Sequence, residues 1–436
     1  MLPRSPPMPL HWAWPYGGVS HSQTWIEEAA MRVMIVGGGF IGGHLAGRLR
    51  AEGCAVTVAG RRSADIACDL ARDDATVWTE RLCGHDALVN CAGVLAAGAD
   101  YDGVHAQGAI ALFDGAARAG VARVVQISAL GASEGTTAYH RSKRAADEHL
   151  TKLDLGWAIV RPSLVVGRGG GSTALFSALA ALPLMPDIGG GMVQPIAIAD
   201  LVDAIWRLLQ RPLPMSLVVD AVGPQPMRIL DLMAILRHWL GLGVASSLPV
   251  PRWMLRAVAS LGIGPVTRDS LTMLEAGNAA PVEPFVTALG FLPQPVAQFL
   301  AAHPATHGDV LAARLVPMEP ALRGLLAAVW LAGGLVPLLL TPMGRNTHLL
   351  ARLGLTGEAA IGTVWAGSLA DMTVALALIL RCRGAALVGV ALMVAYSLIL
   401  AAIAPELWGD PFGALVKNLA VLGLSLAINA MEKPRA

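Results

Sequence analysis

Four long apolar stretches near the end of the chain restrict its architecture more than any other feature. They cover residues 324–344, 359–380, 384–404 and 411–430. At about 1.5 Å rise per residue, an apolar helix of about 20 residues crosses the roughly 30 Å hydrocarbon core of a bilayer. The sequence therefore predicts an all-α four-helix transmembrane domain in residues 321–436. Core helices of a large soluble domain are the alternative, because Asp371 and Lys417 interrupt two of the stretches.

The composition also indicates membrane contact. Hydrophobic residues make up 55% and charged residues 14% of the 436 residues, whereas soluble proteins have roughly 25% charged residues. A formal net charge of +1 gives no field to attract nucleic acid, so we expect the lipid bilayer, and no nucleic acid, as a partner.

The five cysteines are scattered and never spaced as C-x-x-C, which indicates neither a disulfide framework nor a metal site.

Basic residues near the apolar stretches predict the orientation in the membrane. Three regions that share one side of a four-helix domain carry Arg314, Arg323, Arg381, Arg383, Lys433 and Arg435. The positive-inside rule places both termini and the preceding domain in the cytoplasm. The opposing loops are mixed in charge, with Arg345, Arg352, Glu406 and Asp410. We expect a multi-pass membrane protein, in the bacterial inner membrane if the source is prokaryotic.

The rest of the chain divides into three parts. Residues 1–30 are rich in proline and lack a signal-peptide pattern, so we expect a disordered extension or a mis-assigned start, with translation beginning at Met31. We expect residues 31–305 to form one nucleotide-binding α/β domain whose C-terminal part lies on the substrate side, and residues 306–320 to form a linker. Between 31 and about 222, apolar β-branched runs alternate with alanine-rich helical patterns: RVMIVG, AVTVAG, DALVNCAG, RVVQISA and WAIVRPS. This alternation predicts a doubly wound α/β domain with a parallel sheet; prolines interrupt the helices that follow.

A glycine-rich loop follows the first of these strands. Gly37, Gly39 and Gly42 match G-x-G-x-x-G and open a helical segment. Such glycines allow a tight turn and close approach to a pyrophosphate, which meets the helix N-terminus, here with Phe40 and Ile41. A glycine-rich turn without a ligand is the alternative.

The second strand ends in Gly60-Arg61-Arg62, where an NAD-selective protein usually offers a carboxylate. Arginine suits a 2′-phosphate, so Arg61 and Arg62 favour NADP(H), with NAD(H) also possible. Two solvated surface arginines are the alternative. Further candidates for the cofactor are residues near the adenine and at the end of the fourth strand, although each can also be part of a turn: Asp69, Leu70, Cys91, Ala92 and Gly93.

Ser128, Tyr139 and Lys143 are the candidate catalytic residues. Tyr139 and Lys143 form Y-x-x-x-K, a spacing that puts both on one helical face. A neighbouring ammonium favours the phenolate of a tyrosine, so we expect Tyr139 to exchange a proton with a substrate while hydride passes to or from a nicotinamide. Lys143 would also bind the ribose, and Ser128 the substrate oxygen. A chance Y-x-x-x-K on an ordinary helix is the alternative.

The segments GGGFIGGHL, NCAG, ISALGA, YHRSK and IVRPSLVVG resemble the short-chain dehydrogenase/reductase superfamily. IVRPSLVVGRGGGSTALF and QPIAIADLVDAI narrow the resemblance to extended and atypical members, of the epimerase/dehydratase type and similar to an accessory subunit of respiratory complex I. The resemblance implies a Rossmann fold, a nicotinamide cofactor that also contacts Pro162, and catalytic roles for Ser128, Tyr139 and Lys143.

Three positions depart from the family pattern. Val36 replaces the first glycine of the usual G-x-x-G-x-x-G, and His105 replaces a common asparagine that supports a proton-relay water. Ala129 follows Ser128 where many members have Ser or Thr. The departures leave cofactor binding expected and make turnover and the choice of serine less secure.

The end of the chain, with AGSLADMTVALALIL and WGDPFGALVKNLAVL, resembles DoxX-like four-helix membrane domains. Asp371 and Lys417 would either pair inside the bundle as part of a proton or quinone site or serve only structural roles, with Lys417 snorkelling. The tract from Pro249 to Met273 would lie on the membrane surface or pack on the sheet as a lid.

Together these patterns predict a membrane-tethered NAD(P)-dependent oxidoreductase. Its substrate would be a small, lipophilic or membrane-delivered carbonyl or hydroxyl compound. The alternatives are a nucleotide-sugar epimerase or dehydratase and a non-catalytic NADPH-bound scaffold, with a membrane redox or assembly partner.

Overall fold

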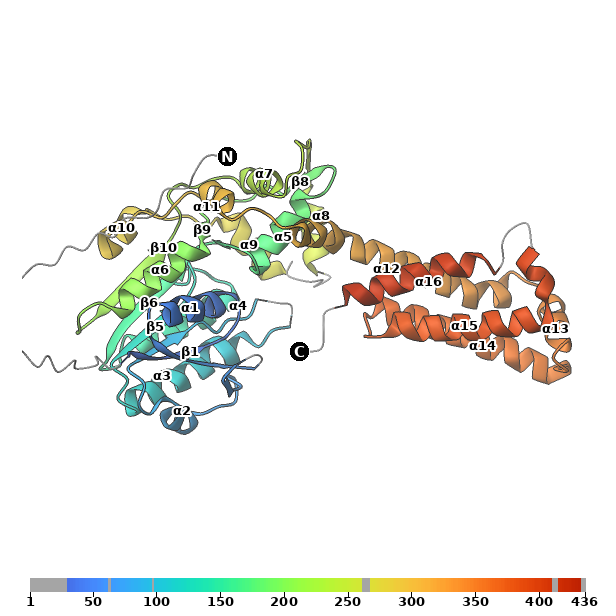
Figure 1. Ribbon diagram of the computed structural model, residues 1–436, viewed down its shortest axis with the longest axis horizontal. Helices are drawn as coiled ribbons and strands as arrows, with labels where there is room; N and C mark the ends of the chain where they lie inside the picture. Colours follow the sequence, from blue (N-terminus) through green and yellow to red (C-terminus); the bar gives the residue numbers. More distant parts are fainter. Residues whose placement is uncertain (1–29, 62–63, 96–97, 261–266, 410–414, 433–436) are drawn as a thin grey trace, which may run out of the picture.

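A computed structural model describes residues 30–61, 64–95, 98–260, 267–409 and 415–432. An α/β domain is followed by an elongated bundle of helices, and one long helix, α12, joins the two (Figure 1). Residues 1–29 of the expected extension at 1–30 lie outside the described residues, as do Arg62, Asp410, Lys433 and Arg435.

The α/β domain is built on a seven-stranded sheet in the order β10-β6-β5-β4-β1-β2-β3. Its strands are β1 (Arg32–Val36), β2 (Ala55–Gly60), β3 (Ile66–Ala67), β4 (Ala87–Asn90), β5 (Arg123–Ile127), β6 (Gly156–Pro162) and β10 (Ser216–Ala221). All neighbouring strands are parallel. The strand order reverses between β1 and β4, and ligands of such sheets bind in the crevice at the strand ends there. The predicted doubly wound Rossmann-type sheet is confirmed.

Two groups of helices cover the two faces of this sheet. Side chains of α1 (Phe40–Ala51) and α6 (Ile198–Leu209) share one buried apolar cluster with Val33 and Ile35. The opposite cluster joins Met34 and Val36 to α2 (Ala75–Leu82), α3 (Gly108–Arg118) and α4 (Ala138–Leu150). Because alternate residues of β1 enter different clusters, this strand is buried on both faces.

Further elements of the domain follow β6 and β10 in the chain. They are β7 (Val165–Val166), α5 (Gly171–Ala180), β8 (Met185–Asp187), β9 (Ile196–Ala197), α7 (Ile229–Trp239), β11 (Ser247–Pro249), α8 (Arg252–Ser260), α9 (Arg268–Ala276), α10 (Glu283–Leu289) and α11 (Val296–Ala302). From about residue 224 onward the sequence pattern predicted helices interrupted by prolines. The structure adds two short parallel pairs, β7 with β9 and β8 with β11; strands of two or three residues are too short to leave a periodic pattern.

The C-terminal domain consists of α12 (His307–Leu339), α13 (Met343–Ala351), α14 (Gly357–Ile379), α15 (Ala385–Ile403), a 3-10 helix (Pro405–Gly409) and α16 (Lys417–Met431). Three of these helices, α12, α14 and α15, are long and apolar enough to cross a membrane. The described part of the fourth predicted span, α16, has 15 residues. The predicted linker at 306–320 is helical from His307 onward, because α12 begins there with Thr306 as its N-cap.

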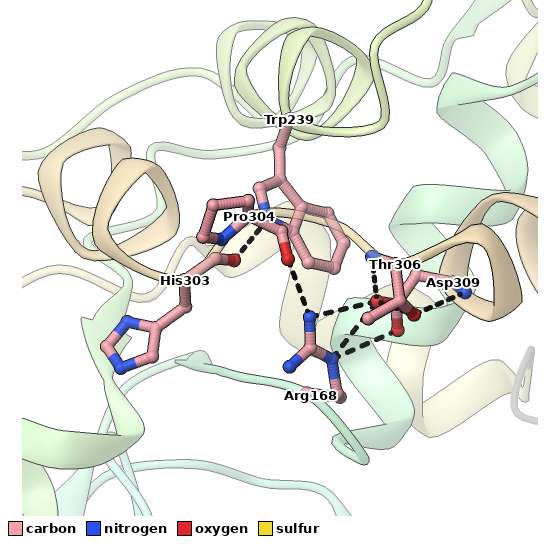
Figure 2. A network of polar contacts seen from close by, with 6 residues as sticks. All are labelled: Arg168, Trp239, His303, Pro304, Thr306 and Asp309. Atoms are coloured by element: carbon pink, nitrogen blue, oxygen red, sulfur yellow. Dashed lines mark hydrogen bonds and ion pairs between the residues drawn. The ribbon is translucent and has the colours of Figure 1, made fainter.

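A polar junction holds the first turn of α12 against the α/β domain (Figure 2). Arg168, which follows β7, donates to Asp309 at 3.0 Å and to the carbonyl oxygen of Pro304 at 2.9 Å. The Trp239 indole, at the end of α7, donates to the carbonyl oxygen of His303 at 2.8 Å. Helix α12 also packs along α5. The long helix is therefore anchored on the domain before it enters the bundle.

Candidate functional site

The loop between β1 and α1 has the shape that a diphosphate cradle requires. Gly37 has φ +98°, and a Cβ atom there would lie 2.6 Å from the Ala92 nitrogen. A Cβ atom on Gly42 would lie 2.0 Å from the Gly37 carbonyl oxygen, whereas one on Gly39 would meet open space. Gly37 and Gly42 are thus required by packing, and Gly39 leaves room for a ligand. Val36 is a buried, extended residue of β1, so the turn that needs glycine falls on Gly37, which explains this departure from the family pattern.

The first turn of α1 faces the same crevice without a side-chain cap. Its N-cap is Gly39, no side-chain cap hydrogen bond is formed within the described residues, and no acidic residue lies in the first turn. Free amides and the positive end of a 12-residue helix favour an anion. The residues present therefore fit the diphosphate of a dinucleotide, with Phe40 and Ile41 supplying backbone amides.

Residues Cys91–Gly93 follow β4 on the other side of the crevice. The backbone of Cys91 and Ala92 packs directly on Gly37. A Cβ atom on Gly93 would lie 3.7 Å from Lys143 Nζ and 3.7 Å from His105 Nε2. Burial raises the pKa of the Cys91 thiol to about 12 against the influence of Lys143, so this thiol stays protonated and is not a nucleophile.

Lys143 is buried at the centre of the site. Its ammonium donates to the carbonyl oxygens of Ala92 at 3.2 Å and Ile127 at 2.9 Å. An ammonium has three hydrogens, which leaves one for a ligand. Burial lowers the pKa of Lys143 to about 8, although Asp147 and Cys91 act in the opposite direction.

Tyr139 lies in a cluster of aromatic rings with Tyr101 and His105. The ring centroids of Tyr139 lie 5.8 Å from Tyr101 and 5.3 Å from His105, both edge to face, and Tyr101 stacks on His105 at 5.7 Å. Burial, reinforced by Tyr101, raises the pKa of Tyr139 to about 12. This differs from the expected lowering by Lys143, because the ammonium bonds two carbonyl groups and the phenol lies among aromatic rings.

His105 has a defined tautomer at the position of the family's asparagine. Its Nε2 accepts from the Val94 amide at 2.9 Å, so Nδ1 carries the proton and donates to Ser142 Oγ at 3.2 Å. Burial and the charge of Lys143 lower the pKa of His105 to about 3. The imidazole is therefore neutral at pH 7, and it holds the loop after β4 against α4.

Ser128 is buried, but its hydroxyl is directed to another partner. Ser128 Oγ donates to Asp147 Oδ2 at 2.7 Å, and Arg161 lies 3.5 Å from the same carboxylate. Asp147 stands one helical turn after Lys143 on α4. The structure thus brings Tyr139 and Lys143 to the crevice and binds the Ser128 hydroxyl into a buried network with Asp147 and Arg161.

Sequence reasoning missed Tyr101 and Asp147 at this site. Both were open to detection by spacing, since Tyr101 stands four residues before His105 and Asp147 four after Lys143. A π-helical turn, Asp102–Gln107, carries His105 and follows Tyr101 directly. Such turns occur frequently at functional sites.

The predicted adenine side of the site is more exposed. Arg61 directly follows β2 and is exposed. The Asp69 carboxylate accepts from the Ala71 amide at 3.3 Å and lies 3.5 Å from Arg72, so it closes its own turn. Leu70 is buried in the α2–α3 cluster. Pro162 is the last residue of β6, and its carbonyl oxygen accepts from the Leu130 amide at 3.0 Å.

A separate cavity of 440 Å³ lies between α1, α6 and the junction with α12. Its lining includes His44, Arg168, Trp239 and His303, and none of the predicted catalytic residues. Within the described residues, no group of His, Cys, Asp and Glu has the arrangement of a metal site.

The helical domain contains its own buried carboxyl group. Asp371, on α14, lies beside the Tyr396 hydroxyl of α15, and a Cβ atom on Gly333 of α12 would lie 2.6 Å from Asp371 Oδ2. Lys417 is exposed at the start of α16, and no ion pair joins it to Asp371 in the described chain. The considered pairing of Asp371 with Lys417 is therefore wrong, because the partner of Asp371 is a tyrosine on a neighbouring helix.

Two family models match the chain. Residues 37–204 match an NAD(P)H-binding family, and residues 327–426 match the DoxX-like family. No curated protein matches the sequence. The chain thus combines an NAD(P)H-binding domain of Rossmann type with a C-terminal DoxX-like domain, as the resemblance implied.

Solved structures give the same fold for the first domain. MoeE5 in complex with UDP-glucuronic acid and NAD is 18% identical, with a TM-score of 0.50, over 62% of this chain and 96% of that chain. MoeE5 in complex with UDP-glucose and NAD is 19% identical, with the same TM-score and coverage. At this identity the likeness establishes the fold alone.

Proposed function

We propose that the chain is a membrane-tethered NAD(P)-dependent oxidoreductase. The observation that carries the proposal is the meeting of the Gly37–Gly42 cradle with Lys143 and Tyr139 at the strand-order reversal between β1 and β4. A bound nicotinamide would supply or accept the hydride. The dinucleotide-binding residues are the loop amides, Lys143 for the ribose, and Arg61 with Arg62 for a 2′-phosphate, which makes NADP(H) the preferred form.

Tyr139 exchanges the proton at the substrate oxygen in this proposal. With its pKa raised to about 12, the phenol is protonated at neutral pH. The phenol is therefore in the protonated form that donation to a carbonyl oxygen requires, as the carbonyl carbon takes up hydride.

The position of the helical domain supports a substrate that arrives from the membrane. The three membrane-length helices begin with α12, which is anchored on the α/β domain by Arg168 and Asp309. A domain tethered in this way works next to the bilayer, where lipophilic carbonyl compounds concentrate. We place the α/β domain and both termini in the cytoplasm on the distribution of arginines.

The test uses the full chain in detergent or lipid discs. NADPH and NADH oxidation is measured against lipophilic aldehydes, quinones and sugar nucleotides, with Tyr139→Phe as the test variant and Tyr396→Phe, the same change in the helical domain, as control. We expect the Tyr139 variant to lose about 100-fold to 10,000-fold in turnover while NADPH affinity is retained. Equal turnover in both variants would contradict the assignment of Tyr139, and turnover of sugar nucleotides alone would indicate an epimerase or dehydratase.

One observation favours a second candidate, a non-catalytic NADPH-bound scaffold. The Ser128 hydroxyl donates to Asp147, so the expected contact with a substrate oxygen would require this bond to break. Tight NADPH binding without turnover on any substrate class would favour the scaffold.

A further inference from the structure

Helix α8 presents an unusually apolar outer surface to solvent. Of its nine described residues, Ala259 is the buried one. Trp253 is 71% exposed, Met254 43% and Val258 44%. Large apolar side chains gathered in this way on a solvent-exposed face indicate a contact surface.

The arrangement around the helix separates apolar and basic groups. At 3.6 residues per turn, Trp253, Met254, Ala257 and Val258 fall on one side of α8, whereas Leu255 and Ala259 turn toward the domain. Arg252 and Arg256, four residues apart, flank the apolar side. In the part of the chain that the structure describes, neither arginine forms an ion pair. An apolar outer face with unpaired cations beside it is typical of helices that lie in a membrane interface.

The location of α8 fits the same partner. It lies at the end of the α/β domain from which α12 leaves toward the bundle (Figure 1). Exposed leucines on neighbouring segments, Leu184 before β8 and Leu248 in β11, add to the apolar surface of this region. The exposed apolar side chains of α12 continue from Leu311 and Leu315 to Val316 and Met318.

We propose that α8 is an interfacial helix that inserts its Trp253, Met254 and Val258 face into the headgroup boundary of an anionic bilayer. Tryptophan prefers this depth because its ring is apolar and its N–H is polar. Arg252 and Arg256 bind lipid phosphates, which are the complementary charge. Since α12 already tethers the domain, a short helix suffices for stable contact. The inference rests on the proposed membrane location of the helical domain.

The experiment measures tryptophan quenching by lipids in the full chain. The protein is placed in anionic lipid discs with and without brominated acyl chains, and the contribution of each tryptophan is the difference between wild type and its phenylalanine variant. Trp365, exposed on α14, is the positive control for the bundle. A tryptophan at Leu292, exposed after α10, in a Trp253→Phe background is the control for the opposite end of the domain.

We expect brominated lipid to reduce the Trp253 and Trp365 contributions about twofold, and the Leu292→Trp contribution not at all. Changing Arg252 and Arg256 to Gln should weaken the quenching of Trp253 in anionic discs and leave that of Trp365 unchanged. Quenching of Trp365 but not of Trp253, with Trp253 open to aqueous iodide, would overturn the inference while the membrane location stands. A Trp253 protected from both quenchers, with cross-links between two copies at α8, would also overturn it. Loss of quenching at Trp365 would remove the membrane location itself and the inference with it.

Discussion

Two buried cations, one in each half of the molecule, are held in different ways. Lys143 in the α/β domain bonds the carbonyl oxygens of Ala92 and Ile127, with no carboxylate in direct contact among the described residues. Arg323 in the helical domain is paired with Glu319 at 2.6 Å and with Glu432 at 3.5 Å, and Glu319 also binds Arg381. The charge of Arg323 is thus neutralised within the protein, whereas that of Lys143 remains available to a ligand. We therefore interpret Lys143 as part of a binding site and Arg323 as part of a structural ion cluster.

Replacing Arg323 with Met should have the largest effect on stability. The change leaves Glu319 and Glu432, both largely buried, without their main partner, and breaking a buried pair costs roughly 3 to 5 kcal/mol. Hydrogen exchange of the α12 and α16 amides measures the loss. Arg314, which is exposed on α12 without an ion pair in the described chain, gives the matched control Arg314→Met. NADPH affinity should stay at the wild-type value, and a loss of affinity would contradict the separation of the two halves.

A methyl group at Gly37 should be the next most damaging change, this time in the cofactor cradle. Gly37→Ala combines φ +98° with a 2.6 Å approach to backbone, for which we expect about 2 to 3 kcal/mol of destabilisation and loss of NADPH binding. Gly47→Ala is the matched control within α1, where a Cβ atom meets open space; it should stabilise by about 0.5 to 1 kcal/mol. Thermal unfolding and calorimetric titration with NADPH distinguish the two. Wild-type binding by the Gly37 variant would mean that the loop is not the cradle.

The glycine loop and the residues around Lys143 show which parts of a site a single sequence can reveal. Glycine spacing predicted the tight loop because Gly37 and Gly42 interact within a local turn. The Lys143 and Tyr139 spacing identified a shared helical face for the same reason. The partner of Ser128 was not predictable, since its hydroxyl direction depends on how β5 packs on α4, and Asp147 lies 19 residues away.

The sequence also predicted most, but not all, of the strands of the sheet. The five strand patterns correspond to β1, β2, β4, β5 and β6. The edge strands β3 and β10 were missed, because β3 has two residues and β10 carries the exposed Val218 between inward residues. In the helical half, composition alone indicated the spans, but it contained no information on the Arg323 cluster or the Asp371–Tyr396 contact, which depend on helix packing.

In the α/β domain, Lys143→Met tests whether the charge of this buried lysine serves a ligand. Removing one charged hydrogen bond to a ligand should lower NADPH affinity about tenfold to 100-fold, with a change in stability well below that of Arg323→Met.

The wild-type domain should also gain stability as the pH rises from about 8 toward 10.5, because the folded state then binds fewer protons at Lys143 than the unfolded state. The methionine variant should lack this gain. Hydrogen exchange of β4 and β5 amides across this pH range tests it, and an unchanged pH profile would contradict the buried ammonium.

His105 predicts a pH dependence of the same sign, but in the range below neutrality. Its folded pKa of about 3 lies below the usual 6.5, so the unfolded state binds an extra proton between these values. Stability should therefore fall as the pH drops below about 6.5, by at most about 1.4 kcal/mol per pH unit. His105→Asn, which restores the family's residue, should flatten this slope. Urea unfolding of the two proteins between pH 7 and 5 provides the measurement, and parallel slopes would exclude His105 as the source.

The ion pair between the halves should give the smallest effect. Arg168 is 48% exposed and Asp309 17%, so solvent screens their attraction, and a double-mutant cycle with Arg168→Ala and Asp309→Ala should give a coupling energy of about 0.5 to 1 kcal/mol. The exposed pair of Arg228 and Asp231 is the control and should couple less. The readout is hydrogen exchange in the first turns of α12. A coupling near zero would mean that packing on α5 and the hydrogen bond from Trp239 to His303, and not this ion pair, hold the long helix against the α/β domain.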